Sequence, residues 1–153
     1  MKERVAYGKV APGGYRAMAG LERYVRESGL EKSLLELVRL RASQLNGCAF
    51  CLDMHWKDAR VAGESEQRLY GLDAWRETSY YSERERAALA WTEGVTLIAD
   101  NHVSDELYEQ VRQYFSEEEL VNLTLAVVAI NGWNRLAISF RTEPGTYQPP
   151  SVH

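Results

Sequence analysis

Two cysteines and one of the three histidines stand close together in the chain, as Cys48, Cys51 and His55. The pair Asn46-Gly47 just before them is typical of a break between two helices, so Cys48 is expected at the start of the second helix. Successive helical residues turn by about 100°, which places both thiols and the imidazole on one face. These residue types can perform thiol redox chemistry or bind a metal ion.

The rest of the same helix indicates that this face turns inward. Leu52 and Ala59 fall on the same side as the cysteines, whereas Asp53, Lys57 and Arg60 cluster on the opposite side. Because charged side chains prefer water, the cysteine face is expected to pack against the protein.

A helix N-terminus favours a reactive thiol. It carries roughly half a positive elementary charge and unsatisfied N–H groups, so a thiol there has a lowered pKa and a larger thiolate fraction. Cys48 and Cys51 both fall in the first turn, and this argument does not choose the nucleophile between them. His55 follows Cys51 by four positions, a spacing at which side chains meet, and could relay a proton.

A disulfide between residues three apart on a helix needs local tightening of the first turn. Their Cβ atoms lie about 5–6 Å apart in a regular helix, whereas a relaxed disulfide needs about 3.5–4.5 Å. Such strain raises the reduction potential, and so small a closed loop stabilises the fold little. Cys48 and Cys51 therefore suit a pair that cycles between thiol and disulfide better than a structural disulfide.

Glu36 is the carboxylate that could reach this site. At about 1.5 Å per residue it lies about 15 Å before the turn, and His55 about 12 Å after it, so antiparallel helices would bring the two level. On a helical wheel, however, Glu36 points away from the apolar stripe that contains Leu34 and Val38. The residues alone therefore favour a capping or surface role for Glu36.

Less reactive interpretations remain open at this point. The cysteines could be buried and inert, and His55 could be an ordinary core histidine. A zinc site is a further alternative, with Cys48, Cys51 and His55 as ligands and either Glu36 or His102 as the fourth. His102 and His153 otherwise fall in a loop and in the tail, where we assign them no role.

The bulk properties set limits on function. The chain has 153 residues, 45% hydrophobic and 26% charged, enough for one domain with its own core. Its net charge of −4 gives no support for nucleic-acid binding. The first ten residues lack the apolar run of a secretory signal, so we expect a cytoplasmic protein. The apolar segment 120–140 is interrupted by asparagines and an arginine, which indicates a buried helix and no membrane association.

The hydrophobic period predicts an all-α single domain, a helical bundle around the central hairpin. Ser28 or Ser33 is expected to open the helix that carries Glu36, and Ser104 to cap a short helix. Two serine–glutamate pairs have capping-box spacing at the starts of the long later helices. The last helix is apolar nearly all round, which predicts burial in the centre or between subunits. The expected elements are an arm over 1–12, helices over 15–28, 33–46, 48–62, 82–98, 104–111 and 116–140, a helical turn over 64–70, a connection over 71–81 and an irregular tail over 142–153.

Together these residues resemble the alkylhydroperoxidase D-like members of the carboxymuconolactone decarboxylase family. The resemblance rests on Glu36, eleven intervening residues, the CAFC run at 48–51, and three further residues before His55. It continues through SERERAALAWTEGVTLI and EEELVNLTLAVVAINGWNRLAISFR, and covers about residues 30 to 141.

The resemblance implies a peroxidase. In the family pattern Cys51 attacks the peroxide oxygen and becomes a sulfenic acid, and Cys48 then resolves it as a disulfide. The pattern also makes Glu36 and His55 the proton relay, in place of a capping role for Glu36. An all-helical protomer that assembles into trimers or hexamers is implied as well.

One position departs from the family pattern. The alkylhydroperoxidase D site has a histidine just before its second cysteine, whereas this chain has Phe50, which predicts a weaker proton network. Lactone decarboxylation is not expected, because that branch of the family lacks the cysteine pair. We interpret four residues of a recurring family segment as structural, subunit-contact or pocket-flanking residues: Asn131, Trp133, Asn134 and Arg135.

The sequence thus predicts a cofactor-free, metal-free antioxidant enzyme that reduces hydroperoxides with electrons from a dithiol, thioredoxin-like or lipoyl reductant. Two alternatives are a general disulfide oxidoreductase and a non-enzymatic redox sensor or binding protein whose assembly changes on oxidation. All three require two sulfur atoms that are close together, and the peroxidase requires them to be accessible to a small oxidant.

Overall fold

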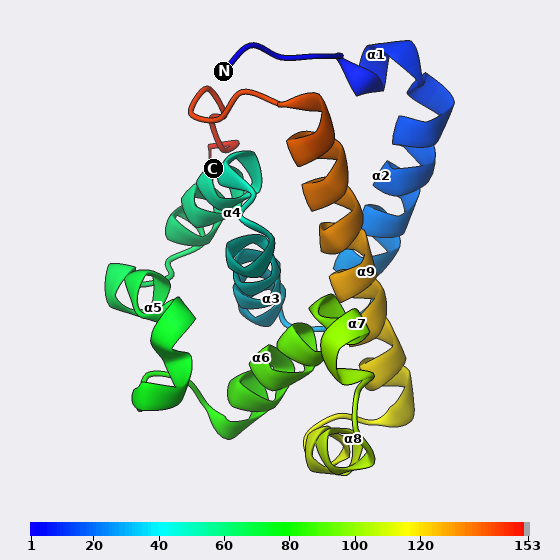
Figure 1. The fold of residues 1–153 in the computed structure, drawn as a ribbon. Coiled ribbons are helices and arrows are strands. Elements are labelled where there is room, and N and C mark those ends of the chain that lie inside the picture. Colours follow the sequence, from blue (N-terminus) through cyan, green and yellow to red (C-terminus); the bar gives the residue numbers. More distant parts are fainter. Residues whose placement is uncertain (152–153) are drawn as a thin grey trace.

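In the computed structural model, which describes residues 1–151, all regular structure is helical, and Figure 1 shows the arrangement. The predicted all-α fold is confirmed, and the predictions for residues 152 and 153, including His153, lie outside the described residues. The elements are α1 (Tyr7–Val10), α2 (Pro12–Arg26), α3 (Lys32–Asn46), α4 (Ala49–Val61), α5 (Glu66–Tyr70), the 3₁₀ helix η1 (Leu72–Glu77), α6 (Glu83–Thr96), α7 (Ile98–Asn101), α8 (Asp105–Arg112) and α9 (Glu117–Phe140).

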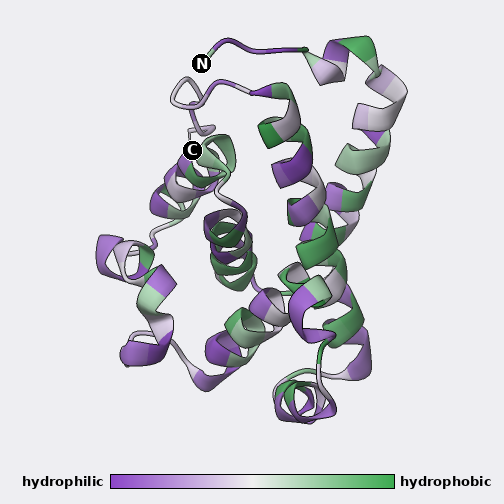
Figure 2. Ribbon diagram, viewed as in Figure 1, coloured by the Kyte–Doolittle hydropathy of each residue, from purple (hydrophilic) through white to green (hydrophobic). Residues whose placement is uncertain are grey.

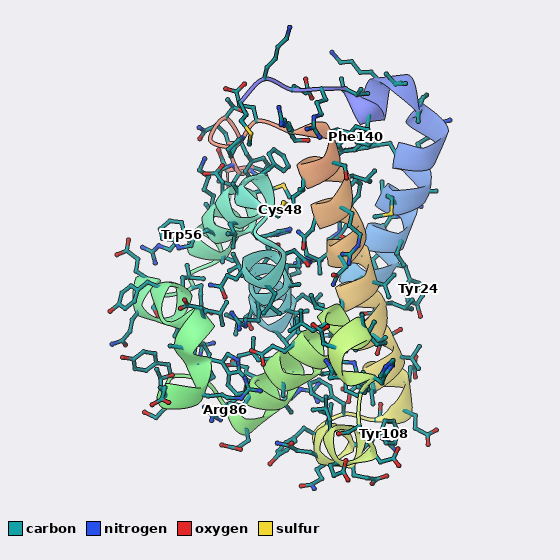
Figure 3. All side chains as sticks on the ribbon, viewed as in Figure 1. Tyr24, Cys48, Trp56, Arg86, Tyr108 and Phe140 are labelled. Atoms are coloured by element: carbon teal, nitrogen blue, oxygen red, sulfur yellow. A yellow bond between two sulfur atoms is a disulfide. The ribbon has the colours of Figure 1, made fainter. Side chains whose placement is uncertain are left out.

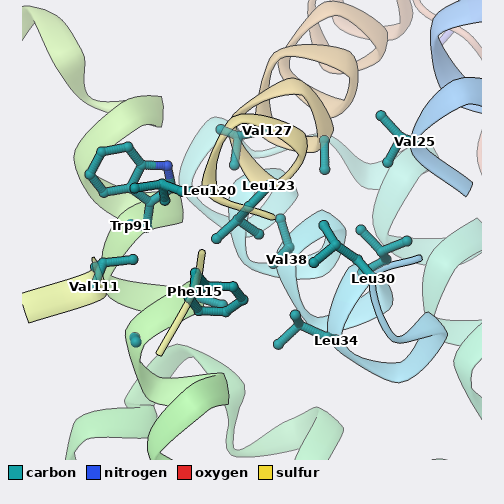
Figure 4. Close-up of a cluster of buried hydrophobic side chains, with 14 residues drawn as sticks. Val25, Leu30, Leu34, Val38, Trp91, Val111, Phe115, Leu120, Leu123 and Val127 are labelled. Atoms are coloured by element: carbon teal, nitrogen blue, oxygen red, sulfur yellow. The ribbon is translucent and has the colours of Figure 1, made fainter. Parts of the chain in front are cut away.

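Helix α3 is the centre of the bundle. It packs against α4, α6 and α9, and α2 covers another side of α9 (Figure 1). The main apolar core lies where these helices meet, and Figure 4 shows its side chains. Val25, Val38, Leu123 and Val127 are fully buried there. This core holds α3 in place, and α4 packs on α3 outside it.

Local capping signals set several helix starts as predicted. Ser82 with Glu85 and Ser116 with Glu119 form complete capping boxes at α6 and α9. Ser104 accepts a backbone N–H in the first turn of α8. Each cap satisfies N–H groups that have no partner inside the helix.

Neither serine expected to open α3 does so, and this prediction is wrong. The N-cap residue is Glu31, which makes no side-chain cap. Ser28 instead donates its hydroxyl to the carbonyl oxygen of Val25, at the end of α2, and Ser33 lies inside α3. Leu30 and Leu34 pack in the main core, so tertiary burial holds this helix start in place of a local cap.

The N-terminal region is more helical than expected. Helix α2 begins at Pro12 rather than near Tyr15, with proline at the first helical position, where its missing N–H has no cost. The expected arm contains α1, and its Arg4 donates backbone and guanidinium hydrogen bonds to carbonyl groups at the end of α9. The first residues therefore lie against the chain's own last helix.

Helix α9 is long and apolar enough to cross a membrane by length and composition alone, with an 18-residue window of mean hydropathy 1.3. It packs against α2, α3 and α6, however, and Figure 2 shows green, hydrophobic residues along its middle. Asn122 and Asn134 are buried on it and hydrogen-bonded to Tyr24 and Ser43. These contacts are those of a core helix, and an apolar strip remains exposed on its outer side.

Candidate active site

The turn between α3 and α4 places Cys48 at the N-terminus of α4. Gly47 ends α3 in the left-handed conformation, with a φ of 69°, which glycine adopts without steric cost. Cys48 is then the N-cap residue of α4, and its Sγ accepts the backbone N–H of Cys51 at 3.4 Å. The expected position of Cys48 is confirmed, and a thiolate there would face the positive end of the helix dipole.

Cys48 and Cys51 are joined as a disulfide, with their Cα atoms 5.4 Å apart. Only 1% and 2% of their surfaces are exposed. They pack with Ala42, Ile130 and Ala137, and Figure 3 shows Cys48 between α4 and α9. The sulfur atoms are as close as expected, but this oxidised form is closed, so an oxidant or reductant reaches them only after neighbouring side chains move.

Glu36 and His55 meet across the hairpin. His55 Nδ1 donates to Glu36 Oε2 at 3.0 Å, and the His55 residue is 7% exposed. The geometric estimate that brought these residues level is confirmed. The helical-wheel prediction that Glu36 points to the surface is wrong, because the hairpin partner and a buried arginine, Arg39, provide polar contacts on that side of α3.

The Glu36 carboxyl is held in its charged form. Burial by itself would raise its pKa, but the hydrogen bond and charge of His55, followed by those of Arg39, lower it further than burial raises it. The net result is a pKa below the ordinary value for glutamic acid. Glu36 is therefore a carboxylate at neutral pH and can accept the Nδ1–H of His55.

The C-terminal tail, residues 142–151, crosses the charged side of α4. Lys57 Nζ donates to Asp53 and to the carbonyl oxygen of Tyr147, at 2.9 and 3.0 Å. The Tyr147 hydroxyl donates to Asp58 at 2.7 Å, and burial, together with this hydrogen bond, raises the pKa of Tyr147 to about 12. These contacts hold α4 from outside, while its cysteine face packs inside.

A second set of polar contacts fixes the end of α3 to α9. Asn46 Nδ2 donates to the side-chain oxygens of Asn131 and Asn134, at 3.0 and 2.9 Å. Asn134 donates in turn to Ser43, and Arg135 donates to Asn131. Three of the four residues singled out in the recurring segment thus position the turn that carries the cysteines.

The zinc alternative finds no ligand set among the described residues. Within residues 1–151, no group of three or more His, Cys, Asp or Glu side chains is arranged to hold a metal ion. Both cysteines are in the disulfide, and His102 lies at the C-terminal end of α7.

Sequence reasoning missed two charged residues beside the site, Arg39 and Glu22. Arg39 donates to Glu36 at 2.7 Å and to Glu22 at 2.5 Å. The spacing of Arg39 three residues after Glu36 was an available signal, since such pairs are neighbours on a helix. Glu22 lies on α2 and had no signal, because only the packing of α2 brings it to Arg39.

Comparison with known proteins places this geometry among relatives. Residues 12–94 match the model of the carboxymuconolactone decarboxylase family. The uncharacterised protein YdfG of Bacillus subtilis (strain 168) is 48% identical over 139 residues, which are 91% of this chain and 95% of YdfG.

Solved structures resemble the whole fold. A protein of unknown function from Agrobacterium tumefaciens, provisionally named the antioxidant defence protein AhpD, is 46% identical with a TM-score of 0.92, and the match covers 95% of this chain and all of that one (100%). The AhpD core of an uncharacterised peroxidase-related protein from Ralstonia eutropha JMP134 has a TM-score of 0.80 at 19% identity, over 91% of this chain and 74% of that chain. At that identity the likeness concerns the fold alone.

Proposed function

The chain belongs to the carboxymuconolactone decarboxylase family as an alkylhydroperoxidase D-like member, and from this we propose that it is an enzyme, a thiol-dependent peroxidase. The observation that carries the proposal is the Cys48–Cys51 pair at the start of α4, one helical turn before His55, which is hydrogen-bonded to the partly buried Glu36. A thiolate can take an oxygen from a peroxide, a second thiol can close the resulting sulfenic acid to a disulfide, and an acid–base pair can supply the protons that these steps need.

In the oxidative step, the Cys51 thiolate attacks one oxygen of the hydroperoxide. The O–O bond breaks, Cys51 becomes a sulfenic acid, and the leaving alkoxide takes a proton to become an alcohol. His55 is the proposed proton donor, with Nδ1 held by Glu36, so that Nε2 is the nitrogen available for the transfer.

In the resolving step, the Cys48 thiolate attacks the Cys51 sulfur and displaces hydroxide, which leaves as water after protonation. The product is the disulfide that the structure contains. A dithiol reductant, thioredoxin-like or carrying a lipoyl group, then supplies two electrons and two protons by thiol–disulfide exchange. We place this cycle in the cytoplasm, where such reductants keep thiols reduced, and in a homo-oligomer, a trimer or hexamer.

The burial of both sulfur atoms favours a second candidate function. Cys48 and Cys51 are 1% and 2% exposed, so their disulfide would exchange with an external thiol slowly unless the structure opens. Slow exchange suits a redox sensor that is oxidised once and then changes its assembly. A general disulfide oxidoreductase is a less favoured form of the same chemistry. Catalytic turnover distinguishes the peroxidase from the sensor.

The test is a hydroperoxide assay on purified protein with cumene hydroperoxide and either dihydrolipoamide or dithiothreitol. We expect the wild type to consume many equivalents of peroxide, and Cys51→Ser to abolish turnover. Cys48→Ser should react once and retain a sulfenic acid at Cys51, detected by mass spectrometry as a dimedone adduct. Each cysteine variant is the control for the other.

Two outcomes would contradict the mechanism. Full turnover by Cys51→Ser would show that Cys51 is not the attacking group. A wild type that consumes only one equivalent of peroxide, with every reductant tried, would support the sensor instead.

A further inference from the structure

A series of partly buried polar contacts continues from His55 across three more helices. The Glu36 carboxylate binds His55 through Oε2 at 3.0 Å and Arg39 through Oε1 at 2.7 Å. The other terminal nitrogen of Arg39 donates to Glu22 Oε1 at 2.5 Å, and Trp133 Nε1 donates to Glu22 Oε2 at 3.2 Å. The five residues come from α2, α3, α4 and α9.

We propose that Arg39 and Glu22 are positioning residues of the proton relay, which fix the orientation and charge of Glu36 so that it serves His55. The catalytic consequence rests on the proposed peroxidase function, whereas the effect on Glu36 itself does not. Neither residue touches the cysteines in the structure, and both act through Glu36.

The division of labour between the two Glu36 oxygens supports this role. A carboxylate can rotate and offer either oxygen, but here each oxygen has its own partner. Arg39 has a fixed planar fork of N–H groups, and its two terminal nitrogens bind two different carboxylates. Oε2 of Glu36 is thereby left for His55 Nδ1, which fixes the imidazole tautomer.

The charges of these linked residues support the same role. Glu22, Arg39 and Glu36 together carry one net negative charge, so a positive charge on His55 is balanced locally when the imidazole holds a proton. The side chain of Arg39 is only 8% exposed, and water screens these charges little. Without Arg39, two carboxylates would share a poorly solvated space, which favours protonation of one of them.

Trp133 is the fourth residue of the recurring family segment, and its contacts are structural. Its indole N–H holds the outer oxygen of Glu22, and its ring packs edge-on against Tyr15 of α2, with centroids 5.6 Å apart. Trp133 is therefore the last residue in this series of contacts, and it holds Glu22 where α9 meets α2. Tyr147 of the C-terminal tail is a further titratable group, whose pKa the charge of Glu36 helps to raise, and it lies on the α4 side, hydrogen-bonded to Asp58.

The experiment compares Arg39→Met and Arg39→Lys with the matched control Arg41→Met. Arg41 lies two residues further along α3 and is similarly buried, but it pairs with Glu93 at 2.9 Å in a separate cluster. The first readout is the titration of Glu36, followed by the ¹³C shift of its labelled carboxyl group, and it needs no catalytic activity. The second is the pH profile of peroxide turnover, with kcat and KM measured separately.

We expect Arg39→Met to raise the pKa of the Glu36 carboxyl and to lower kcat at least about tenfold at neutral pH, with little change in KM, because general acid–base groups contribute about 10²–10⁴-fold. Arg39→Lys should restore part of both effects, since an ammonium group supplies the charge but not the fork. Arg41→Met should leave the titration of Glu36 and the pH profile as in the wild type.

The possible results separate this inference from the proposed function. An unchanged titration of Glu36 in Arg39→Met overturns the inference, even if the wild type is an active peroxidase. A raised Glu36 pKa in a protein that turns over no peroxide supports the positioning role and overturns the peroxidase. Should Arg39→Met fail to fold, an Arg39→Lys variant with wild-type titration and wild-type pH profile overturns the inference on its own.

Discussion

At the scale of single residues, the two ring nitrogens of His55 have different roles in the mechanism that we propose. Glu36 accepts the Nδ1–H of His55. Nε2 is then the nitrogen that would exchange a proton near Cys51, which lies one helical turn earlier on α4. Phe50 stands where the family pattern has a second imidazole before the second cysteine. In the mechanism that we propose, the proton transfers therefore rest on the Glu36–His55 pair, so the charge of Glu36 should matter for turnover.

Glu36→Gln should slow peroxide turnover about 100-fold, in the range that a positioned acid–base pair contributes, and should also change the stability in acid. Because the pKa of Glu36 is lower in the folded protein than in an unfolded chain, its stabilising contribution is complete above the ordinary glutamate pKa. That contribution is lost as the pH falls through the lower, folded pKa. Denaturant titrations from pH 7 to pH 3 should therefore show a smaller acid loss in the variant.

The control for Glu36→Gln is Glu118→Gln, the same change at an exposed position in the first turn of α9. It should leave turnover unchanged. If Glu36→Gln turned over peroxide at the wild-type rate, Glu36 would have no part in the relay. A wild-type and a variant protein that lose stability in parallel through acid would show that Glu36 is not selectively stabilised as a carboxylate.

At the scale of elements, the α3–α4 turn decides whether the cysteines reach the helix N-terminus. Gly47→Ala would introduce a side chain with no atom within 4 Å to clash with, so its cost is that of the left-handed backbone alone. That cost is about 1–2 kcal/mol of unfolding free energy. Chemical denaturation with the disulfide intact should measure it.

Gly20→Ala is the matched control for this substitution. Gly20 lies inside α2, with a helical backbone and nothing within 4 Å of an added Cβ. The same change there should be neutral or should stabilise by up to about 1 kcal/mol, because alanine is the better helix former. Equal effects of the two substitutions would mean that the turn does not require glycine.

The elements that sequence reasoning predicted well are those with local causes. Ser82 and Ser116 are each followed three residues later by a glutamate, a spacing that predicts a helix start, and Gly47 predicts the turn. The start of α3 was missed because Leu30 and Leu34 hold it by packing. Pattern alone had no means to weigh that burial against the serine caps.

The candidate site was predictable to the same extent. Helical periodicity predicts that Cys48, Cys51 and His55 turn inward, and all three are buried. The inward direction of Glu36 does not follow, because it depends on Arg39 and on Glu22 of another helix. A helical wheel predicts burial from the apolar residues on one side of a helix, whereas polar side chains, Arg39 and His55, cover Glu36.

At the scale of the whole molecule, the outer side of α9 carries exposed apolar side chains. On α9, Val121 and Val128 are 60% and 49% exposed and lie seven residues apart, so they share one side of the helix. Leu97 and Ile98 are also exposed, next to Thr96, which is hydrogen-bonded to Asn131 of α9. Exposed apolar surface of this kind marks an interface more often than a free surface.

The homo-oligomer that we propose should therefore depend on this patch. Replacing both Val121 and Val128 with aspartate places charges where a symmetric interface would exclude water, so the variant should elute as a 17.4 kDa protomer while retaining its helical content. Light scattering coupled to size-exclusion chromatography gives the mass.

Val10→Asp is the control, because Val10 is 73% exposed on α1 and its change should leave the assembly intact. A wild type that is already monomeric, or a double variant of unchanged mass, would show that α9 is apolar on its outer side for another reason.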